Sequence, residues 1–126
     1  RLCFDQELAS RIYAGADIYL MPSKSEPCGL SQLIAMRYGT VPVVAATGGL
    51  RDTVPPYNSE TKEGRGFTFQ SYNADDFLGA IDRAVGLYYG AREEWNELAK
   101  RDMECDFSWQ QPAAEYMQLY TELRSK

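Results

Sequence analysis

Residues 22–54 read PSKSEPCGLSQLIAMRYGTVPVVAATGGLRDTV and contain two strand–loop–helix units in tandem. The first unit follows an apolar run at 18–21 and turns through 26–29 into an amphipathic segment. The second follows the apolar run at 41–44 and turns through 47–49 into a short helix. Near-continuous apolar runs are typical of parallel strands that are covered on both faces. The pattern therefore predicts an α/β fold with adjacent parallel strands.

Both loops are predicted to receive a phosphate. A helix start exposes unpaired backbone N–H groups and the positive end of the peptide dipoles, and these stabilise an anion. The carboxyl ends of neighbouring parallel strands lie at one edge of a sheet, which is where open α/β sheets hold nucleotides. We therefore expect the two loops to lie side by side and to form a nucleotide site.

Glu26 is the strongest candidate for chemistry in the first loop. Pro27 restricts the backbone, and the helix that follows would hold the Glu26 carboxylate at the mouth of the cleft. From position alone, a capping carboxylate that balances the helix dipole is an equal alternative. The backbone N–H groups of Gly29, Leu30 and Ser31, with one hydroxyl, would hold a phosphate. Their alternative is an unliganded helix cap.

The other positions in the two loops have small side chains. Thr47, Gly48 and Gly49 leave room for a ligand or for a second backbone segment that passes close. An ordinary strand-to-helix turn is the alternative for these three residues. Cys28 lies in the first turn of the helix, where it is either an accessible thiol or a small buried residue.

Composition excludes several classes of function. The chain has 126 residues, a net charge of −5 and no stripe of Lys or Arg, so nucleic-acid and anionic membrane partners are not expected. Without histidine, neither a Ser-His-Asp triad nor a histidine-based metal site can form. Asp75 and Asp76 are interpreted as acidic residues at a helix start, and no metal or other cofactor is expected. Three cysteines without paired spacing favour a cytoplasmic location.

The rest of the sequence predicts one more strand and several helices. Residues 66–70 alternate and are expected to form a short third strand. Residues 55–66 have no apolar period and are expected to form an exposed, mobile loop. Apolar stripes on the helices are expected to pack in a core or between domains. The expected helices are Gln6–Gly15 capped by Asp5; 74–89 capped by Asn73, with Phe77, Ile81, Val85 and Tyr88; one with Trp95, Leu98, Ala99 and Met103; and one capped by Ser108, with Trp109, Ala113, Tyr116, Met117 and Tyr120.

An ordered set of motifs resembles the bacterial glycogen synthase and plant starch synthase family. The set covers nearly the whole chain and is far more specific than a single Gly-Gly loop. Its members are Arg11-Ile12-Tyr13-Ala14-Gly15-Ala16-Asp17, Glu26-Pro27-Cys28-Gly29-Leu30-Ser31-Gln32-Leu33, Met36-Arg37-Tyr38-Gly39-Thr40-Val41-Pro42-Val43-Val44, Thr47-Gly48-Gly49-Leu50-Arg51-Asp52-Thr53-Val54 and Asp106-Phe107-Ser108-Trp109.

The resemblance implies that residues 1–126 are the later part of a C-terminal, nucleotide-sugar-binding domain of GT-B fold. The sheet would then be an incomplete Rossmann-like layer whose exposed N-terminal edge favours self-association. The C-terminal helix at 108–125 would pack toward an N-terminal domain that lies outside this chain. Because essential groups would lie in the missing parts, we expect the isolated segment to be catalytically inactive.

The implied reaction is a retaining transfer of glucose from ADP-glucose to the non-reducing end of an α-1,4-glucan. Glu26 would be the catalytic residue, and the two loops, with Cys28 in the first, would bind the donor. The ring of Phe4 would stack on adenine, with burial in the core as the alternative. Ile34 stands where many related transferases have a second glutamate that contacts ribose, so the resemblance does not carry that contact over to this chain.

Two other functions remain open at this stage. One is a non-catalytic module that binds a nucleotide or a phospho-sugar. The other is a GT-B transferase that uses a UDP- or GDP-sugar.

Overall fold

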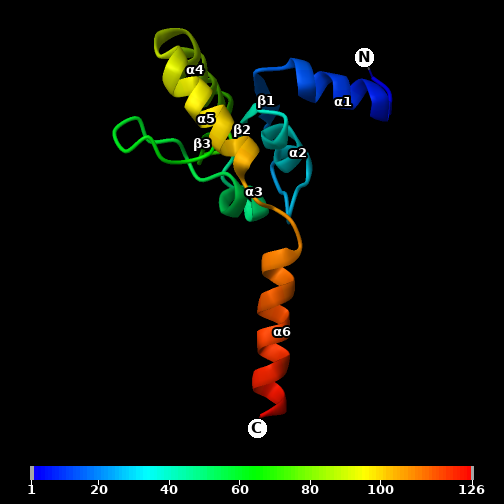
Figure 1. Ribbon diagram of the computed structural model, residues 1–126. Helices are drawn as coiled ribbons and strands as arrows, with labels where there is room; N and C mark the ends of the chain where they lie inside the picture. The colour runs from blue at the N-terminus through cyan, green and yellow to red at the C-terminus, as the bar shows by residue number, and fades with distance from the viewer. Residues whose placement is uncertain (1, 126) are drawn as a thin grey trace.

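The computed structural model describes residues 2–125 and has a parallel three-stranded sheet at its centre (Figure 1). The strand order is β1 (Ile18–Met21), β2 (Val41–Ala45), β3 (Phe67–Phe69), and both pairings are parallel. Ile18 lies opposite Val41. The predicted α/β fold with a Rossmann-like parallel sheet is confirmed.

Six helices complete the described part of the chain, and the predicted ones are found within one or two residues of their expected ends. The Asp5 carboxylate accepts a hydrogen bond from the Leu8 N–H at 3.0 Å, and the Asn73 side chain accepts one from the Asp76 N–H at 2.8 Å. The predicted N-caps Asp5 and Asn73 are therefore confirmed. The predicted cap Ser108 is wrong, because Trp109 occupies the N-cap position of the last helix. The helices are α1 (Gln6–Gly15), α2 (Ser31–Arg37), α3 (Gly48–Thr53), α4 (Ala74–Gly90), α5 (Arg92–Glu104) and α6 (Gln110–Arg124). No helix among residues 2–125 is long and apolar enough to cross a bilayer.

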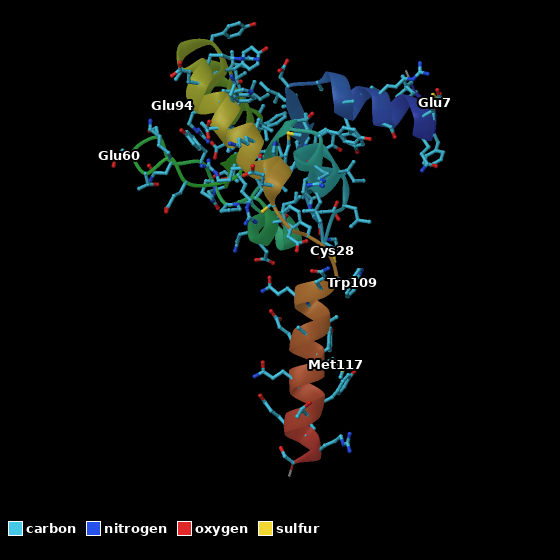
Figure 2. The ribbon with its side chains drawn as sticks, viewed as in Figure 1. Glu7, Cys28, Glu60, Glu94, Trp109 and Met117 are labelled. Atoms are coloured by element: carbon cyan, nitrogen blue, oxygen red, sulfur yellow. The ribbon has the colours of Figure 1, made fainter. Side chains whose placement is uncertain are left out.

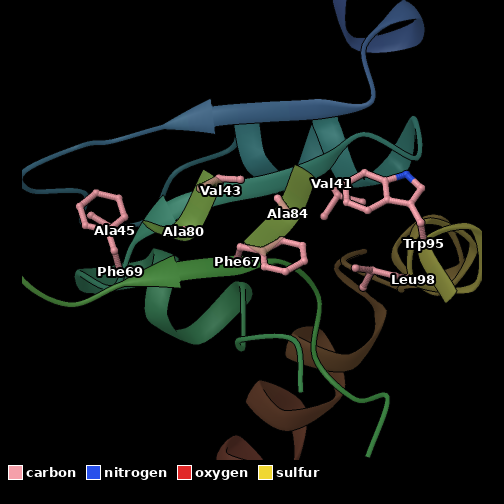
Figure 3. Packing of buried hydrophobic residues seen from close by; sticks show 9 residues of the cluster. All are labelled: Val41, Val43, Ala45, Phe67, Phe69, Ala80, Ala84, Trp95 and Leu98. Atoms are coloured by element: carbon pink, nitrogen blue, oxygen red, sulfur yellow. The ribbon is translucent and has the colours of Figure 1, made fainter. Parts of the chain in front are cut away.

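Strand β2 is the centre of the fold, because all five of its residues are buried. Successive side chains of a strand point to opposite faces, so β2 contributes to two cores. The face covered by α4 and α5 holds the larger cluster: Val41, Val43, Ala45, Phe67, Phe69, Ala80, Ala84, Trp95 and Leu98 (Figure 3). The face covered by α2 and α3 holds the smaller one: Met36, Val44, Leu50 and Val54.

Two details of the sequence interpretation are wrong. The third strand does not alternate between buried and exposed residues, since Phe67, Thr68 and Phe69 are all buried. In α4 the fully buried residues are Ala80 and Ala84, whereas the larger apolar side chains flank them. Small side chains at the contact let the helix approach the sheet closely, and an apolar stripe read from the sequence does not reveal this.

The segment at 55–66 is closed at its base by backbone hydrogen bonds. The Tyr57 N–H donates to the Gly66 carbonyl at 2.7 Å, and the Arg65 N–H donates to the Pro55 carbonyl at 2.8 Å. The Tyr57 ring lies 5.9 Å from the Phe67 ring, which ties the base to the larger core. Residues 58–63 at its tip are exposed.

Helix α6 makes no core contact. None of its residues is buried, and Trp109, which precedes it, is 78% exposed. Figure 1 shows α6 extending away from the sheet and its covering helices. The prediction that this apolar stripe packs into a core is therefore wrong for the described residues. The alternative, that it packs against another domain, stays a prediction.

Asp102 is the one acidic side chain that the structure buries in a core position of α5. It is 1% exposed, and neither carboxylate oxygen has a hydrogen-bond partner within residues 2–125. The sequence interpretation placed Met103 on this face, but Met103 is 44% exposed. Burial raises the pKa of Asp102 to about 8. The positive charges of Arg101 and Arg65 lower this pKa, but by less than burial raises it.

We expect the free energy of unfolding to decrease as the pH rises from about 4 to about 8. The folded state holds the Asp102 proton up to a pKa of about 8, whereas the unfolded chain releases it near 3.8. Folding is therefore favoured at low pH, and the difference across this window is roughly 4–6 kcal/mol. Urea unfolding at pH 5 and pH 8 measures it. The chain has no histidine, so few groups other than Asp102 titrate between about pH 5.5 and pH 8.

The variant Asp102→Ala should lose most of this pH dependence and exceed the parent chain in stability at pH 8. Glu104→Ala is the matched control, because Glu104 is an exposed acidic residue in the same helix turn. Equal slopes for the parent and for Asp102→Ala would contradict the assignment.

Candidate functional site

The two loops that follow β1 and β2 are in direct backbone contact. The Gly49 N–H donates to the carbonyls of Glu26 at 3.0 Å and Pro27 at 3.1 Å. Because β1 and β2 are parallel neighbours, both loops leave the same edge of the sheet. The predicted convergence of the two loops is confirmed.

The two glycines of the second loop are explained by this contact. A Cβ on Gly48 would collide with the Glu26 carbonyl, and a Cβ on Gly49 would lie 2.5 Å from the Cys28 carbonyl oxygen. Gly48 also has a φ of +46°, which side-chain-bearing residues rarely adopt. The sequence left open whether these small residues make room for a ligand or for a second backbone segment. The structure contains the second backbone segment.

The two loops differ in the backbone N–H groups that they leave free. In the second loop, the N–H groups of Thr47, Gly49 and Leu50 all donate to backbone carbonyls. In the first, the N–H groups of Gly29 and Leu30 have no partner within residues 2–125. The first loop therefore leaves adjacent N–H groups unpaired, as predicted for a helix start. In the second loop, at 47–49, the Gly48 N–H has no partner within residues 2–125, and the Gly49 N–H bonds the first loop.

Glu26 lies at the rim of this pair of loops. Its side chain is half-buried, and its carboxylate makes no hydrogen bond or ion pair within residues 2–125. It does not cap a helix: the N-cap of α2 is Leu30 and that of α3 is Thr47, both without a side-chain capping bond. The capping alternative is therefore wrong, and the carboxylate is available to a ligand.

The other residues of the first loop are accessible. Cys28 is exposed, which rules out the small buried filler, and Figure 2 shows it at the far end of the loop that follows β1. Leu30 is 71% exposed. The Ser31 hydroxyl donates to the sulfur of Met21 at 3.3 Å, so it is directed toward β1. A phosphate contact from this hydroxyl would require its rotation.

Phe4 is not brought to the loops. Its side chain is 98% exposed, so burial in the core of this chain is wrong. It precedes α1, which extends away from the rest of the fold toward its N-terminal end in Figure 1. The site therefore unites Glu26, the first loop and the second loop, and it leaves Phe4 outside.

A groove of about 610 Å³ borders the first loop and runs between α2 and the segment that joins α5 to α6. Its walls are largely apolar, and the Arg37 guanidinium on its rim donates to the Met103 carbonyl at 2.5 Å. Within the described part of the chain, no group of three or more His, Cys, Asp or Glu side chains could hold a metal ion. The lining residues are Leu30, Leu33, Ile34, Arg37, Glu104, Cys105, Asp106, Phe107 and Ser108.

Sequence reasoning missed one residue of the site. Gln32 is fully buried beneath the first loop, and its side-chain amide donates to the Cys28 and Gly29 carbonyls. The available signal was a polar residue among the apolar positions of a short amphipathic helix. Periodicity alone assigns such a residue to the solvent face.

Comparison with known proteins identifies the class. The model of the family "Glycosyl transferases group 1" matches residues 4–102. The match covers most of the chain, and the chain belongs to this family of glycosyltransferases.

Among individual proteins the chain is similar to bacterial glycogen synthases. It is 53% identical over 122 residues to a glycogen synthase of Desulforamulus reducens, covering 97% of this chain and 25% of that protein. It is 56% identical over 120 residues to one of Anoxybacillus flavithermus, covering 95% of this chain and 25% of that protein. The chain therefore spans about a quarter of the length of the curated relatives that it matches.

Solved structures agree. The catalytic domain of starch synthase IV from Arabidopsis thaliana, bound to ADP and acarbose, superposes with a TM-score of 0.89 at 41% identity over 99% of this chain and 26% of that one. A sucrose-phosphate synthase from Thermosynechococcus elongatus gives a TM-score of 0.68 at 29% identity, covering 97% of this chain and 29% of that one. The resemblance to the glycogen and starch synthases stated from the motifs is confirmed.

We expect Gly49→Ala to destabilise the chain by roughly 2 kcal/mol or more, because the added Cβ forces the two loops apart. Gly86→Ala is the matched control, since a Cβ there meets no atom within 4 Å and alanine favours the helix. Urea unfolding of both variants measures the effect. A Gly49→Ala protein as stable as the parent would show that the loop contact is not needed.

Proposed function

We propose that the chain is the donor-binding segment of a retaining glucosyltransferase that transfers glucose from ADP-glucose to the non-reducing end of an α-1,4-glucan. The observation that carries the proposal is the backbone contact between the two loops at the carboxyl edge of the sheet, with the unpaired Glu26 carboxylate on its rim. Family membership and the similarity to glycogen synthases support it. The proposed location is the cytoplasm.

The proposed roles follow the geometry of the loops. The free N–H groups of Gly29 and Leu30 take part of the negative charge of the donor diphosphate, with Cys28 and Ser31 beside them. Glu26 orients the glucose or offsets the positive charge that develops at its anomeric carbon.

The second loop has a different proposed role. Thr47, Gly48 and Gly49 support the first loop and bound the sugar pocket. Phe4 remains a candidate for stacking on adenine, and its exposed ring is accessible for this role.

These groups are too few for catalysis alone. A helix end contributes roughly 0.3–1 kcal/mol to anion stabilisation, and about 2 in favourable geometry. Enzymatic acceleration requires about 8–23 kcal/mol. The Arg51 side chain is close to the loops, but its Nη2 donates a hydrogen bond to the Ala46 carbonyl at 2.9 Å. We infer that the groups that neutralise the diphosphate and bind the glucan lie in parts of the protein outside this chain.

Two exposed features fit an incomplete domain. Strand β1 has no strand on its outer side within residues 2–125, and the apolar stripe of α6 is exposed. We propose that 108–125 packs toward an N-terminal domain of the whole protein. In its absence, the β1 edge is a candidate for self-association.

We expect the chain to bind ADP weakly, with a dissociation constant on the order of 1 mM. The N–H groups contribute up to about 2 kcal/mol, and the Phe4 ring adds roughly 1–3 kcal/mol of stacking once it moves against the base of the bound nucleotide. About 4 kcal/mol corresponds to 1 mM. Calorimetric titration with ADP, UDP and GDP compares donors that differ only in the base. Tighter binding of UDP or GDP would indicate a different sugar-nucleotide transferase.

We expect no glucose transfer from ADP-glucose to glycogen by the purified chain, because the loops supply only a small part of the required stabilisation. Release of ADP measures turnover. The Desulforamulus reducens glycogen synthase serves as the positive control in the same assay. Turnover by the 126 residues would contradict the inference that catalysis needs groups from outside this chain.

Binding of ADP by a full-length gene product that never transfers glucose would favour a non-catalytic module.

A further inference from the structure

The side chain of Gln32 connects the two loops from below. Its two Nε2 N–H groups serve three acceptors, with one N–H shared between two of them: the Cys28 carbonyl at 3.2 Å, the Gly29 carbonyl at 3.0 Å and the Thr53 hydroxyl at 3.2 Å. The Thr53 hydroxyl in turn donates to the Gly49 carbonyl at 2.7 Å. We call Gln32 and Thr53, with these four hydrogen bonds, the Gln32–Thr53 clasp.

The clasp fixes the direction of the first loop's peptide units. In a trans peptide the carbonyl and the N–H of one unit point in opposite directions. The carbonyls of Cys28 and Gly29 are held toward Gln32, so the N–H groups of Gly29 and Leu30 point away from it. These are the N–H groups that have no partner within residues 2–125.

The burial of Gln32 is costly for a residue that only fills space. Its Oε1 is buried and accepts no hydrogen bond from any described residue. A buried unsatisfied acceptor costs roughly 1–3 kcal/mol, and an apolar side chain of similar length would avoid that cost. The polar amide is therefore explained by the carbonyls that it holds and not by packing.

Gly29 is adapted to the same arrangement. Its φ is +74°, and a Cβ at this position would lie 2.5 Å from the Gln32 Oε1. The backbone of the first loop thus passes directly over the amide, in a conformation that glycine adopts without strain.

We infer that Gln32 is a positioning residue for the donor diphosphate, acting with Thr53 to hold the first loop against the second. This inference rests on the proposed function, because the diphosphate is the group toward which the free N–H groups are aimed. Neither side chain touches the ligand. Both act through the orientation of backbone carbonyls and the N–H groups linked to them.

The test compares variants of matched shape. Gln32→Met keeps the length of the side chain, removes the unsatisfied acceptor and releases the two loop carbonyls. Thr53→Val removes the hydroxyl with little change in shape, whereas Thr53→Ser retains it. Ala84→Gly destabilises α4 on the opposite face of the sheet and controls for a general loss of stability.

We expect Gln32→Met and Thr53→Val to weaken ADP binding about fivefold to tenfold while their melting temperatures stay close to that of the parent. Thr53→Ser should retain parental affinity, and Ala84→Gly should lower the melting temperature without changing affinity. The backbone amide NMR signals of Gly29 and Gly49 should shift in the first two variants only. In the double variant the losses should not add, because both side chains belong to one network.

The outcomes separate this inference from the proposed function. Parental affinity in Gln32→Met and Thr53→Val, with parental Gly29 and Gly49 signals, overturns the positioning role and leaves the donor site intact. Loss of affinity in Ala84→Gly equal to that in the clasp variants also overturns it, since stability would then account for the effect. A parent chain that binds no ADP at millimolar concentration overturns the proposed function, and the positioning role with it.

Discussion

The hydrogen bonds from the Gly49 N–H to the carbonyls of Glu26 and Pro27 are the contact on which the rest of the site depends. They join residues that are more than 20 positions apart in the sequence, and they exist because β1 and β2 are adjacent and parallel. The contact needs glycine at both 48 and 49, since a Cβ at either position would meet the backbone of the first loop. It places the Glu26 carboxylate at the rim of a joined pair of loops.

The two loops differ in which of their backbone N–H groups are hydrogen-bonded. In the second loop the Gly49 N–H bonds the first loop, and the Thr47 and Leu50 N–H groups bond nearby carbonyls, so this loop acts as a support. The first loop keeps the N–H groups of Gly29 and Leu30 free, and Gln32 holds the corresponding carbonyls on the other side. An anion site built from backbone groups needs such a fixed orientation, because preorganised dipoles stabilise charge without reorganisation.

The periphery of the fold has surfaces that the chain does not cover. The apolar residues of α6, the outer edge of β1 and the ring of Phe4 are all exposed. The chain spans about a quarter of the length of its curated relatives. Exposed apolar stripes and unpaired strand edges are surfaces on which further chain can pack or pair. The core around β2 is fully packed.

The parallel strands, most of the helix bounds and the capping residues Asp5 and Asn73 follow from the amino-acid sequence, because local periodicity and turn chemistry specify these features. The sequence also predicted that the two loops would meet, since neighbouring parallel strands end at one edge of the sheet. Which atoms meet there depends on the packing of the whole chain. The bond between Gly49 and Glu26, the burial of Gln32 and the burial of Asp102 depend on how elements distant in the sequence pack together. No local pattern contains that information, because a polar residue on a short amphipathic helix looks the same from the sequence whether it faces water or holds a loop in place.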